Sequence, residues 1–115
     1  MKIKYRNKNI EVPIKKASSV GKITGLMFKT KNAENLLFEF KKDTKLKIHS
    51  FFVFFTFLVV WLDEKNSVVD LRIVKPFTFA ISPKNSFRKL IELPFNNKNR
   101  EILRFIVGQK DLNTS

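Results

Sequence analysis

The 115-residue sequence has no cysteine, which excludes disulfide bonds and thiolate metal ligands. Its single histidine, His49, excludes a metal site built from several imidazoles. Only three glycines are present, and none has the spacing of a phosphate-binding or dinucleotide-binding loop. We therefore expect this protein to function without a metal or any other cofactor.

The sequence also lacks a long hydrophobic run and a secretory signal. Its longest apolar run, residues 48–62, has fifteen residues, whereas a membrane-spanning helix needs about 20. Residues 1–6 alternate apolar and charged side chains, and no apolar segment follows the charges. We expect a cytoplasmic protein with no transmembrane segment.

Apolar residues are abundant, phenylalanine above all. The chain contains 13 phenylalanines, and 43% of its residues are hydrophobic, which is more than a disordered chain carries. A chain of this length buries roughly two thirds of its unfolded surface, enough for one core but not for two. The sequence thus predicts one domain, residues 1–115, with a frayed tail at residues 113–115.

Positive charge is the other excess. The net charge of +13 divides into +9 for residues 1–50 and +4 for residues 51–115. A basic surface attracts nucleic acid and anionic lipid. Lysine outnumbers arginine by 18 to 5, however, whereas bidentate contacts with phosphate and guanine favour arginine. Two interpretations therefore remain open, a functional polyanion surface or a compositional bias that also enriches Asn, Phe and Ile.

The first 45 residues show the patterns of short strands and one helix. Alternating apolar residues predict a hairpin of two strands across residues 3–14. A serine at position 18 or 19 is suited to cap a short helix at residues 20–27. Residues 36–40 fit a strand, and residues 41–45 fit a polar loop.

The apolar run at residues 48–62 is rich in β-branched and aromatic residues, which favour strand over helix. Because it is longer than a usual strand, we expect a bend near Thr56 between strands at about 47–54 and 57–62. Both alternating faces of the run are apolar, so it has to be covered on both sides. The run is therefore predicted to lie at the centre of the fold.

The rest of the chain predicts a hairpin and a further element. A turn at residues 63–66 and an alternating strand at residues 68–77 complete an antiparallel hairpin with the preceding strand. Residues 87–95 fit either a helix or a strand.

A final helix is predicted near the C-terminus. Asn97 is suited to cap it, and Ile102, Phe105 and Ile106 share one of its faces. Gly108 is placed to end it.

Several short segments, taken in order, resemble those of the uncharacterised family called domain of unknown function 192. They run from about residue 10 to residue 112 and comprise Gly25-Leu-Met-Phe28, Leu36-Leu-Phe-Glu-Phe40, Ile48-His-Ser-Phe-Phe52, Trp61-Leu-Asp63, the strand at residues 68–74, Leu90-Ile-Glu-Leu93 and Val107-Gly-Gln-Lys-Asp111. The resemblance implies a β-rich barrel or sandwich and favours a strand at residues 87–95. Together with the patterns above, it predicts a mainly β (α+β) fold, a compact antiparallel β-barrel or sandwich of about six to seven strands with one or two short helices.

The chain also departs from this family. Many relatives have Lys-Asn-Thr where this chain has Phe51, Phe52 and Val53, and Pro and Asp where it has Thr56 and Leu58. If those polar groups form a site in the relatives, this chain lacks it. The family has no established biochemical activity, so the resemblance implies none for this chain.

No catalytic constellation is visible in the sequence. His49 and Ser50 are adjacent, but successive side chains of a strand point to opposite faces and do not form a dyad. Asp63 and Glu64 stand where a turn is expected, and Asp favours turns through its bond to the backbone. These observations favour a protein that is not an enzyme.

Two groups of residues are candidates for binding. His49, Phe51 and Trp61 in the apolar run are candidate contacts for a ligand or partner. Lys41, Lys42, Lys45 and Lys47 form the densest basic cluster and are candidate contacts for a polyanion, with a solvated loop as the alternative. We expect most of the phenylalanines to lie in the core.

Two functional hypotheses follow. The first is a small non-enzymatic domain that binds a protein partner or an apolar ligand, because the run at residues 48–62 carries more apolar side chains than one face of a strand needs. The alternative is a nucleic-acid-binding module that uses the basic surface of residues 1–50. We expect a monomer or a weak homodimer.

Overall fold

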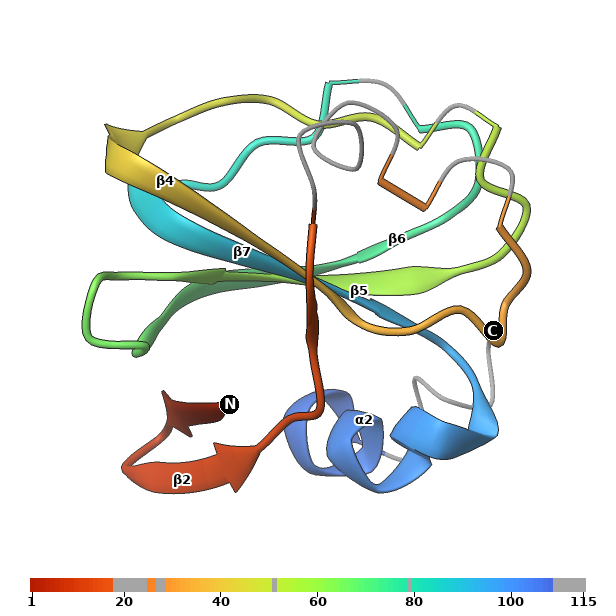
Figure 1. Ribbon diagram of the computed structural model, residues 1–115, viewed down its shortest axis with the longest axis horizontal. Helices are drawn as coiled ribbons and strands as arrows, with labels where there is room; N and C mark the ends of the chain where they lie inside the picture. Colours follow the sequence, from red (N-terminus) through yellow and green to blue (C-terminus); the bar gives the residue numbers. More distant parts are fainter. Residues whose placement is uncertain (18–24, 27–28, 51, 79, 109–115) are drawn as a thin grey trace.

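A five-stranded sheet forms the centre of the computed structural model, which describes residues 1–17, 25–26, 29–50, 52–78 and 80–108. Within these residues the strand order is β3-β4-β7-β5-β6, and all pairings are antiparallel except that of β3 with β4 (Figure 1). The strands are β3 (Lys15–Lys16), β4 (Leu36–Thr44), β5 (Phe57–Leu62), β6 (Val68–Val74) and β7 (Phe87–Pro94).

Strand β5 is buried along its whole length, as predicted for residues 57–62. It pairs with β6 on one side and with β7 on the other. The turn into β6 is held by Asp63, whose Oδ1 accepts hydrogen bonds from the backbone nitrogens of Lys65 and Ser67, both at 2.9 Å. Both faces of β5 are covered, as a strand with apolar side chains on both faces requires.

A hairpin and a helix cover the face of the sheet that is drawn below it in Figure 1. The hairpin consists of β1 (Lys2–Tyr5) and β2 (Lys8–Glu11), as predicted. Helix α2 (Arg100–Val107) follows the 3₁₀ helix η1 (Asn97–Asn99) and is capped by Gly108 at a φ of 89°. The buried core on this side consists of Ile3, Val12, Leu37, Leu58, Val60, Leu62, Ile91, Leu93, Leu103 and Ile106.

Loops cover the opposite face of the sheet. The described residues of segments 45–56 and 75–86 cross above it, and the backbones of Ile48 and Ile81 join them by two hydrogen bonds of 2.8 and 2.7 Å (Figure 1). The second core lies beneath these loops and consists of Leu26, Leu36, Phe38, Val53, Phe57, Val59, Trp61, Val74, Ile81, Phe87 and Leu90.

The fold class agrees with the sequence prediction. The described part of the chain is mainly β, with seven strands in two sheets and one short α-helix, and its layers are sandwich-like. Strands β3 and β6 are the two edges of the five-stranded sheet, which is therefore open and not closed into a barrel.

The predicted strand at residues 47–54 is wrong. Among the described residues of this segment, only Ile48 makes a β-bridge, and Phe52 has a left-handed φ of 57°. Val53 is 2% exposed, whereas its neighbours Phe52 and Phe54 are 47% and 61% exposed. The alternation that resembled a strand is real, but the backbone pairs with residues 77–81 only at isolated points and forms no continuous ladder, so the described part of the segment is a loop.

Two strand ends differ from the prediction. The polar loop expected at 41–45 is wrong for residues 41–44, because β4 continues to Thr44 beside β7, with a register irregularity after Glu39. Strand β6 ends at Val74 and not at Phe77, because Pro76 has no amide hydrogen for a ladder and Phe77 has a left-handed φ of 58°.

The C-terminal helix begins differently from the prediction. The side chain that caps η1 is that of Asn96, whose Oδ1 accepts a hydrogen bond from the backbone nitrogen of Asn99 at 3.0 Å. Leu103 takes the buried position that was expected of Phe105, which is 45% exposed. The helix expected at residues 20–27 lies almost entirely outside the described residues. No helix in the described ranges is long and apolar enough to cross a membrane.

Candidate functional site

Glu92 is an acidic residue in the middle of the central strand β7. Its register partners are Leu36 in β4 and Val59 in β5, and both belong to the core beneath the loops. The residue is only 6% exposed. Glutamate is almost never buried to this extent unless it is paired, so this position requires an explanation.

The carboxyl of Glu92 lacks the partners that a buried acid normally has. In the described structure, its Oε1 is buried without any hydrogen-bond partner. Burial raises the pKa of Glu92 from its ordinary value of 4.5 to about 8. At neutral pH the carboxyl is therefore mostly protonated and is able both to donate and to accept a hydrogen bond.

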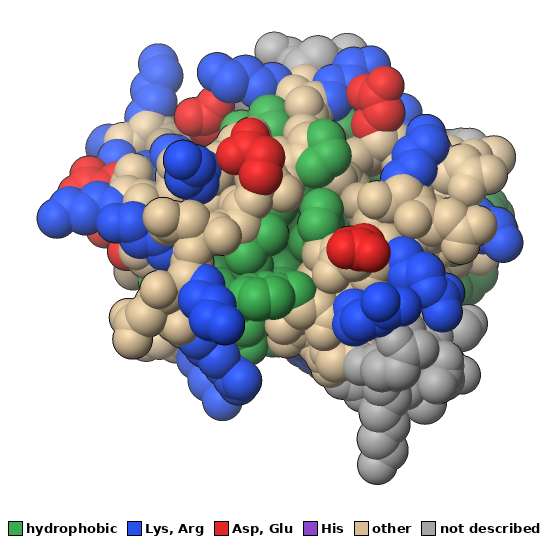
Figure 2. Space-filling model, turned by 90° about the horizontal axis from the view of Figure 1, so that it is seen from below, with side chains coloured by type: hydrophobic (Ala, Val, Ile, Leu, Met, Phe, Trp, Pro, Cys, Tyr) green, Lys and Arg blue, Asp and Glu red, His purple; other side chains and the backbone are tan. Residues whose placement is uncertain are grey.

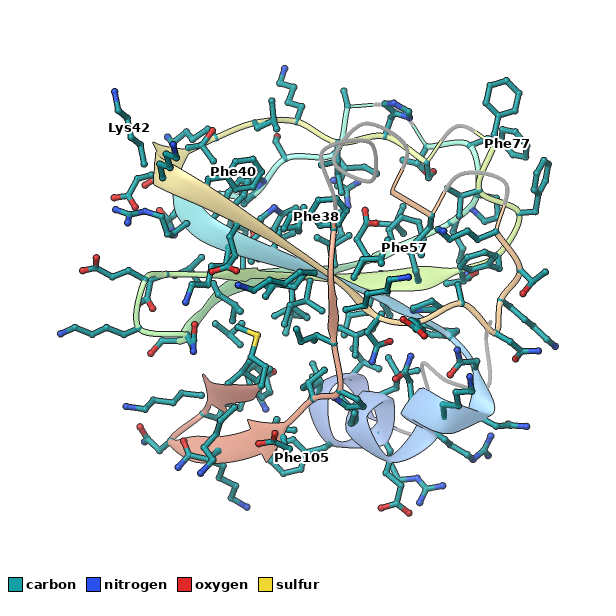
Figure 3. The ribbon with its side chains drawn as sticks, in the orientation of Figure 1. Phe38, Phe40, Lys42, Phe57, Phe77 and Phe105 are labelled. Atoms are coloured by element: carbon teal, nitrogen blue, oxygen red, sulfur yellow. The ribbon has the colours of Figure 1, made fainter. Side chains whose placement is uncertain are left out.

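Glu92 lines a cavity of about 190 Å³ between the sheet and the loops. Most of the residues that line the cavity are apolar, and they include Phe38 and Phe40 of β4, which Figure 3 shows on the loop side of the sheet. Lys47 and His49, both exposed, contribute the basic groups of its lining. The full lining consists of Gly25, Leu26, Phe38, Phe40, Leu46, Lys47, Ile48, His49, Val53, Leu90 and Glu92.

Gly25 explains how the chain leaves room beside this carboxyl. It has a left-handed φ of 52°, and a Cβ atom at this position would lie 3.1 Å from Glu92 Oε1. A side chain would therefore meet both backbone strain and a close contact with the acid. The glycine keeps the space next to Glu92 Oε1 open.

The loop above the cavity is fixed by Ser50, which is fully buried. Its hydroxyl donates to the carbonyl oxygen of Lys75 at 2.8 Å and accepts from the backbone nitrogen of Thr78. These bonds tie residues 48–53 to the segment after β6. Ile48 and Val53 are thereby held over the cavity that Glu92 lines.

The side chains of Asn35 and Asn99 form a second buried polar cluster, and their hydrogen bonds are made within the protein. The amides of Asn35 and Asn99 exchange two hydrogen bonds, of 2.9 and 2.7 Å, and also donate to the carbonyls of Pro13 and Pro94, both at 2.8 Å. All of these partners are internal, so this pair is part of the scaffold. Glu92, by contrast, has an open acceptor facing a cavity.

The structure separates the predicted ligand-binding residues. His49 lines the cavity with Glu92. Trp61 is fully buried below it, on the same face of β5 as Val59, and its indole nitrogen has no hydrogen-bond partner in the described structure. Phe51 lies outside the described residues.

The four candidate lysines are all exposed but do not form a compact patch. Lys41 and Lys42 lie in β4, and Figure 3 shows Lys42 at the far end of that strand. Lys45 and Lys47 follow in the loop that crosses the sheet. Basic side chains are also prominent on the helix-covered face, with several acidic ones among them (Figure 2). The charge is thus spread over the molecule.

The sequence analysis did not identify Glu92. A signal for it exists, because Glu92 is the only charged residue in the segment Leu90-Ile-Glu-Leu93, where it shares its face with Leu90. A lone acid within a segment that is otherwise apolar indicates a buried carboxyl. No group of three or more His, Asp or Glu residues in the described ranges is arranged as metal ligands would be.

Comparison with known proteins identifies a matching family and two structures with a similar fold. A family model, DUF192 (Uncharacterized ACR, COG1430), matches residues 1–102. A protein of unknown function from Novosphingobium aromaticivorans superposes with a TM-score of 0.70 at 11% identity, covering 88% of this chain and 75% of its own. A Sinorhizobium meliloti protein, provisionally named a transcription regulator, does so with a TM-score of 0.71 at 13% identity, covering 88% of this chain and 81% of its own.

No curated protein matches the sequence. At these identities the two structures establish a shared fold and nothing about activity. The family model, however, spans most of the chain and agrees with the segments quoted above. The chain therefore belongs to the uncharacterised DUF192 family.

Proposed function

We propose that this protein is a small binding domain whose ligand is a largely apolar molecule with one neutral hydrogen-bonding group, which contacts the carboxyl of Glu92. The observation that carries the proposal is the open acceptor Oε1 of Glu92, which is buried, lacks a partner among the described residues and belongs to the lining of a cavity. Leaving such an acceptor unsatisfied costs about 1–3 kcal/mol, which a ligand would recover.

The chemistry of the cavity favours a neutral polar group on the ligand. Because burial raises the pKa of Glu92 to about 8, a cation at neutral pH would meet a mostly protonated acid. Lys47 and His49 in the lining, together with the net charge of +13, further disfavour a cationic ligand. An alcohol or a primary amide satisfies the protonated carboxyl without either cost.

The size of the cavity limits the ligand to a small molecule. A cavity of roughly 150 Å³ in another protein binds benzene, and this one measures about 190 Å³. A molecule with one ring or a short branched chain is therefore suitable. This proposal develops the apolar-ligand half of the sequence hypothesis; a protein partner remains a prediction.

Three single-ring probes test the proposal: benzyl alcohol, toluene and benzylamine. We expect benzyl alcohol to bind at pH 7 and to shift the amide NMR signals of residues 46–49 and 90–92. Toluene, which lacks the hydroxyl, should bind about tenfold more weakly, in line with the loss of one hydrogen bond to a buried group. Benzylamine should also bind more weakly than the alcohol.

Two variants make the test specific. Glu92→Leu keeps an apolar side chain of similar size and should abolish the difference between benzyl alcohol and toluene. Glu101→Leu, on the exposed side of α2, is the matched control and should behave as the wild type. If benzyl alcohol shifts no lining residue, or binds Glu92→Leu as tightly as the wild type, the proposal is wrong.

Nucleic-acid binding is a second candidate, favoured by one observation. Lys41, Lys42, Lys45 and Lys47 are exposed, and within the described ranges none of them forms an ion pair. Anisotropy titrations with fluorescent single- and double-stranded oligonucleotides at low salt test it. Absence of binding at about 50 mM salt would rule it out.

A further inference from the structure

Two loops on the cavity side of the molecule lie side by side. Residues 45–56 and 75–86 are joined by the backbone pair of Ile48 and Ile81 and by the bonds of Ser50. By sequence the two segments contain no acidic residue. Four exposed lysines belong to them, Lys45, Lys47, Lys75 and Lys84. We refer to the exposed part of these two segments as the loop face.

The loop face also carries most of the exposed hydrophobic side chains. Leu46, Phe52, Phe54 and Phe77 are 53%, 47%, 61% and 49% exposed. They are four of the five large hydrophobic residues that are exposed in the described structure; the fifth, Phe105, lies on α2. Figure 3 shows Phe77 pointing away from the molecule on the loop side and Phe105 on the opposite side.

Two of these exposed phenylalanines have a backbone conformation that is energetically unfavourable. Phe52 and Phe77 have left-handed φ angles of 57° and 58°, a conformation that costs about 1–2 kcal/mol for a residue with a side chain. The ring of Phe77 meets that of Phe54 edge to face, with centroids 5.4 Å apart. Aromatic rings that are held in a strained conformation and remain exposed to water indicate a surface that binds another molecule or a membrane.

We propose that the loop face docks on an anionic lipid surface, with the phenylalanines inserted at the headgroup boundary and the lysines on the lipid charges. The charge of the loop face complements such a surface, because it combines four exposed lysines with no acid. Apolar side chains beside lysines are the combination that interfacial binding uses.

The observations favour lipid over single-stranded nucleic acid as the partner of the loop face. Base stacking needs aromatic rings, whereas Leu46, which is 53% exposed and has no ring, offers no stacking surface. The basic residues of the loop face are lysines and a histidine, not arginine. A lipid surface accepts aliphatic and aromatic side chains alike.

Co-sedimentation with vesicles tests the proposal on the full chain. We expect binding to phosphatidylcholine vesicles that contain phosphatidylserine, little binding to phosphatidylcholine alone, and weakening as salt is raised. The double variant Phe54→Ser/Phe77→Ser should lower the affinity more than about tenfold. Replacing Lys45 and Lys47 with serine should lower it roughly fivefold per lysine.

Phe105→Ser is the matched control, because Phe105 is also an exposed phenylalanine near a lysine, with Lys8 Nζ 5.6 Å from its ring centroid. It should bind vesicles as the wild type does. The fluorescence of Trp61, the only tryptophan, verifies that each variant is folded.

Two results would overturn the proposal: absence of binding to the anionic vesicles, and an equal loss of binding with Phe105→Ser. If the wild type does not bind vesicles and the loop-face variants lose affinity for a single-stranded oligonucleotide, the loop face is assigned to nucleic acid. None of these outcomes depends on the ligand of the Glu92 cavity, which is tested separately.

Discussion

At the scale of single residues, Glu92 and Asn99 show two opposite ways of burying a polar group. The Asn99 amide finds protein partners for its hydrogen bonds, so its burial stabilises the fold. Glu92 Oε1 finds none in the described structure, so its burial costs stability. Destabilising groups of this kind are often found at functional sites, and for this reason we assign the ligand contact to Glu92.

The raised pKa of Glu92 predicts how stability depends on pH. Its carboxyl binds a proton more tightly in the folded state, at a pKa of about 8, than in the unfolded chain, at the ordinary value of 4.5. The free energy of unfolding should therefore fall as pH rises from about 4.5 to about 8, by on the order of 4 kcal/mol. Urea unfolding followed by Trp61 fluorescence measures it.

Glu92→Gln is the variant that isolates this effect, because an amide has the same shape and does not titrate. The variant should gain stability relative to the wild type across the same pH range and equal or exceed it at pH 8. Parallel stability curves for the two proteins between pH 5 and 8 would contradict the assignment of a raised pKa to Glu92.

At the scale of elements, the helical end of the chain is tied to the sheet by the Asn35–Asn99 pair. Asn99→Ala would leave the Asn35 amide and the carbonyl of Pro94 without their bonds to this side chain. We expect a loss of about 2–4 kcal/mol in the free energy of unfolding, measured by the urea midpoint. Asn97→Ala, at an exposed position of η1, is the control and should change it by less than about 0.5 kcal/mol. A loss no larger than that of the control would show that the pair is not structural.

The apolar run at residues 48–62 divides into two elements with different roles. Its second half became the buried strand β5, as predicted. Its first half became a loop that points Val53 toward the core and Phe52 and Phe54 outward. Hydrophobic periodicity records that side chains alternate, but it does not record whether both sides of the alternation are covered.

At the scale of the whole molecule, the architecture places both candidate binding features on one side. The hairpin β1–β2 and helix α2 close one face of the sheet, while loops close the other (Figure 1). The Glu92 cavity and the loop face both lie on the side of these loops. Loops accommodate such features more easily than regular elements do, because their side chains need not follow a ladder.

The spread of basic residues predicts how mutation of lysines would change the salt dependence of nucleic-acid binding. Because lysines occur on several faces, Lys41→Ser/Lys42→Ser should lower the slope of log affinity against log salt by about two without abolishing binding. Lys2→Ser/Lys98→Ser is the matched control for total charge. If the two double variants lower the slope equally, binding is non-specific attraction to a basic protein, and β4 has no special role.

The sequence by itself determined the mainly β class, the central position of residues 57–62, the hairpins and the glycine end of α2. These features depend on side-chain periodicity and turn chemistry, which are local properties. The sequence also contained the resemblance that identified the family.

Only the tertiary structure decided which side chains meet. The cavity joins Gly25, residues 46–49 and Glu92, which are far apart in the chain, and the raised pKa of Glu92 exists only because β4, β5 and the loops remove water from it. Likewise, whether Phe54 lies in a core or in water depends on a neighbour that the segment itself does not specify. Burial is a property of the assembled fold, and for this reason the candidate site was found in the structure and not in the sequence.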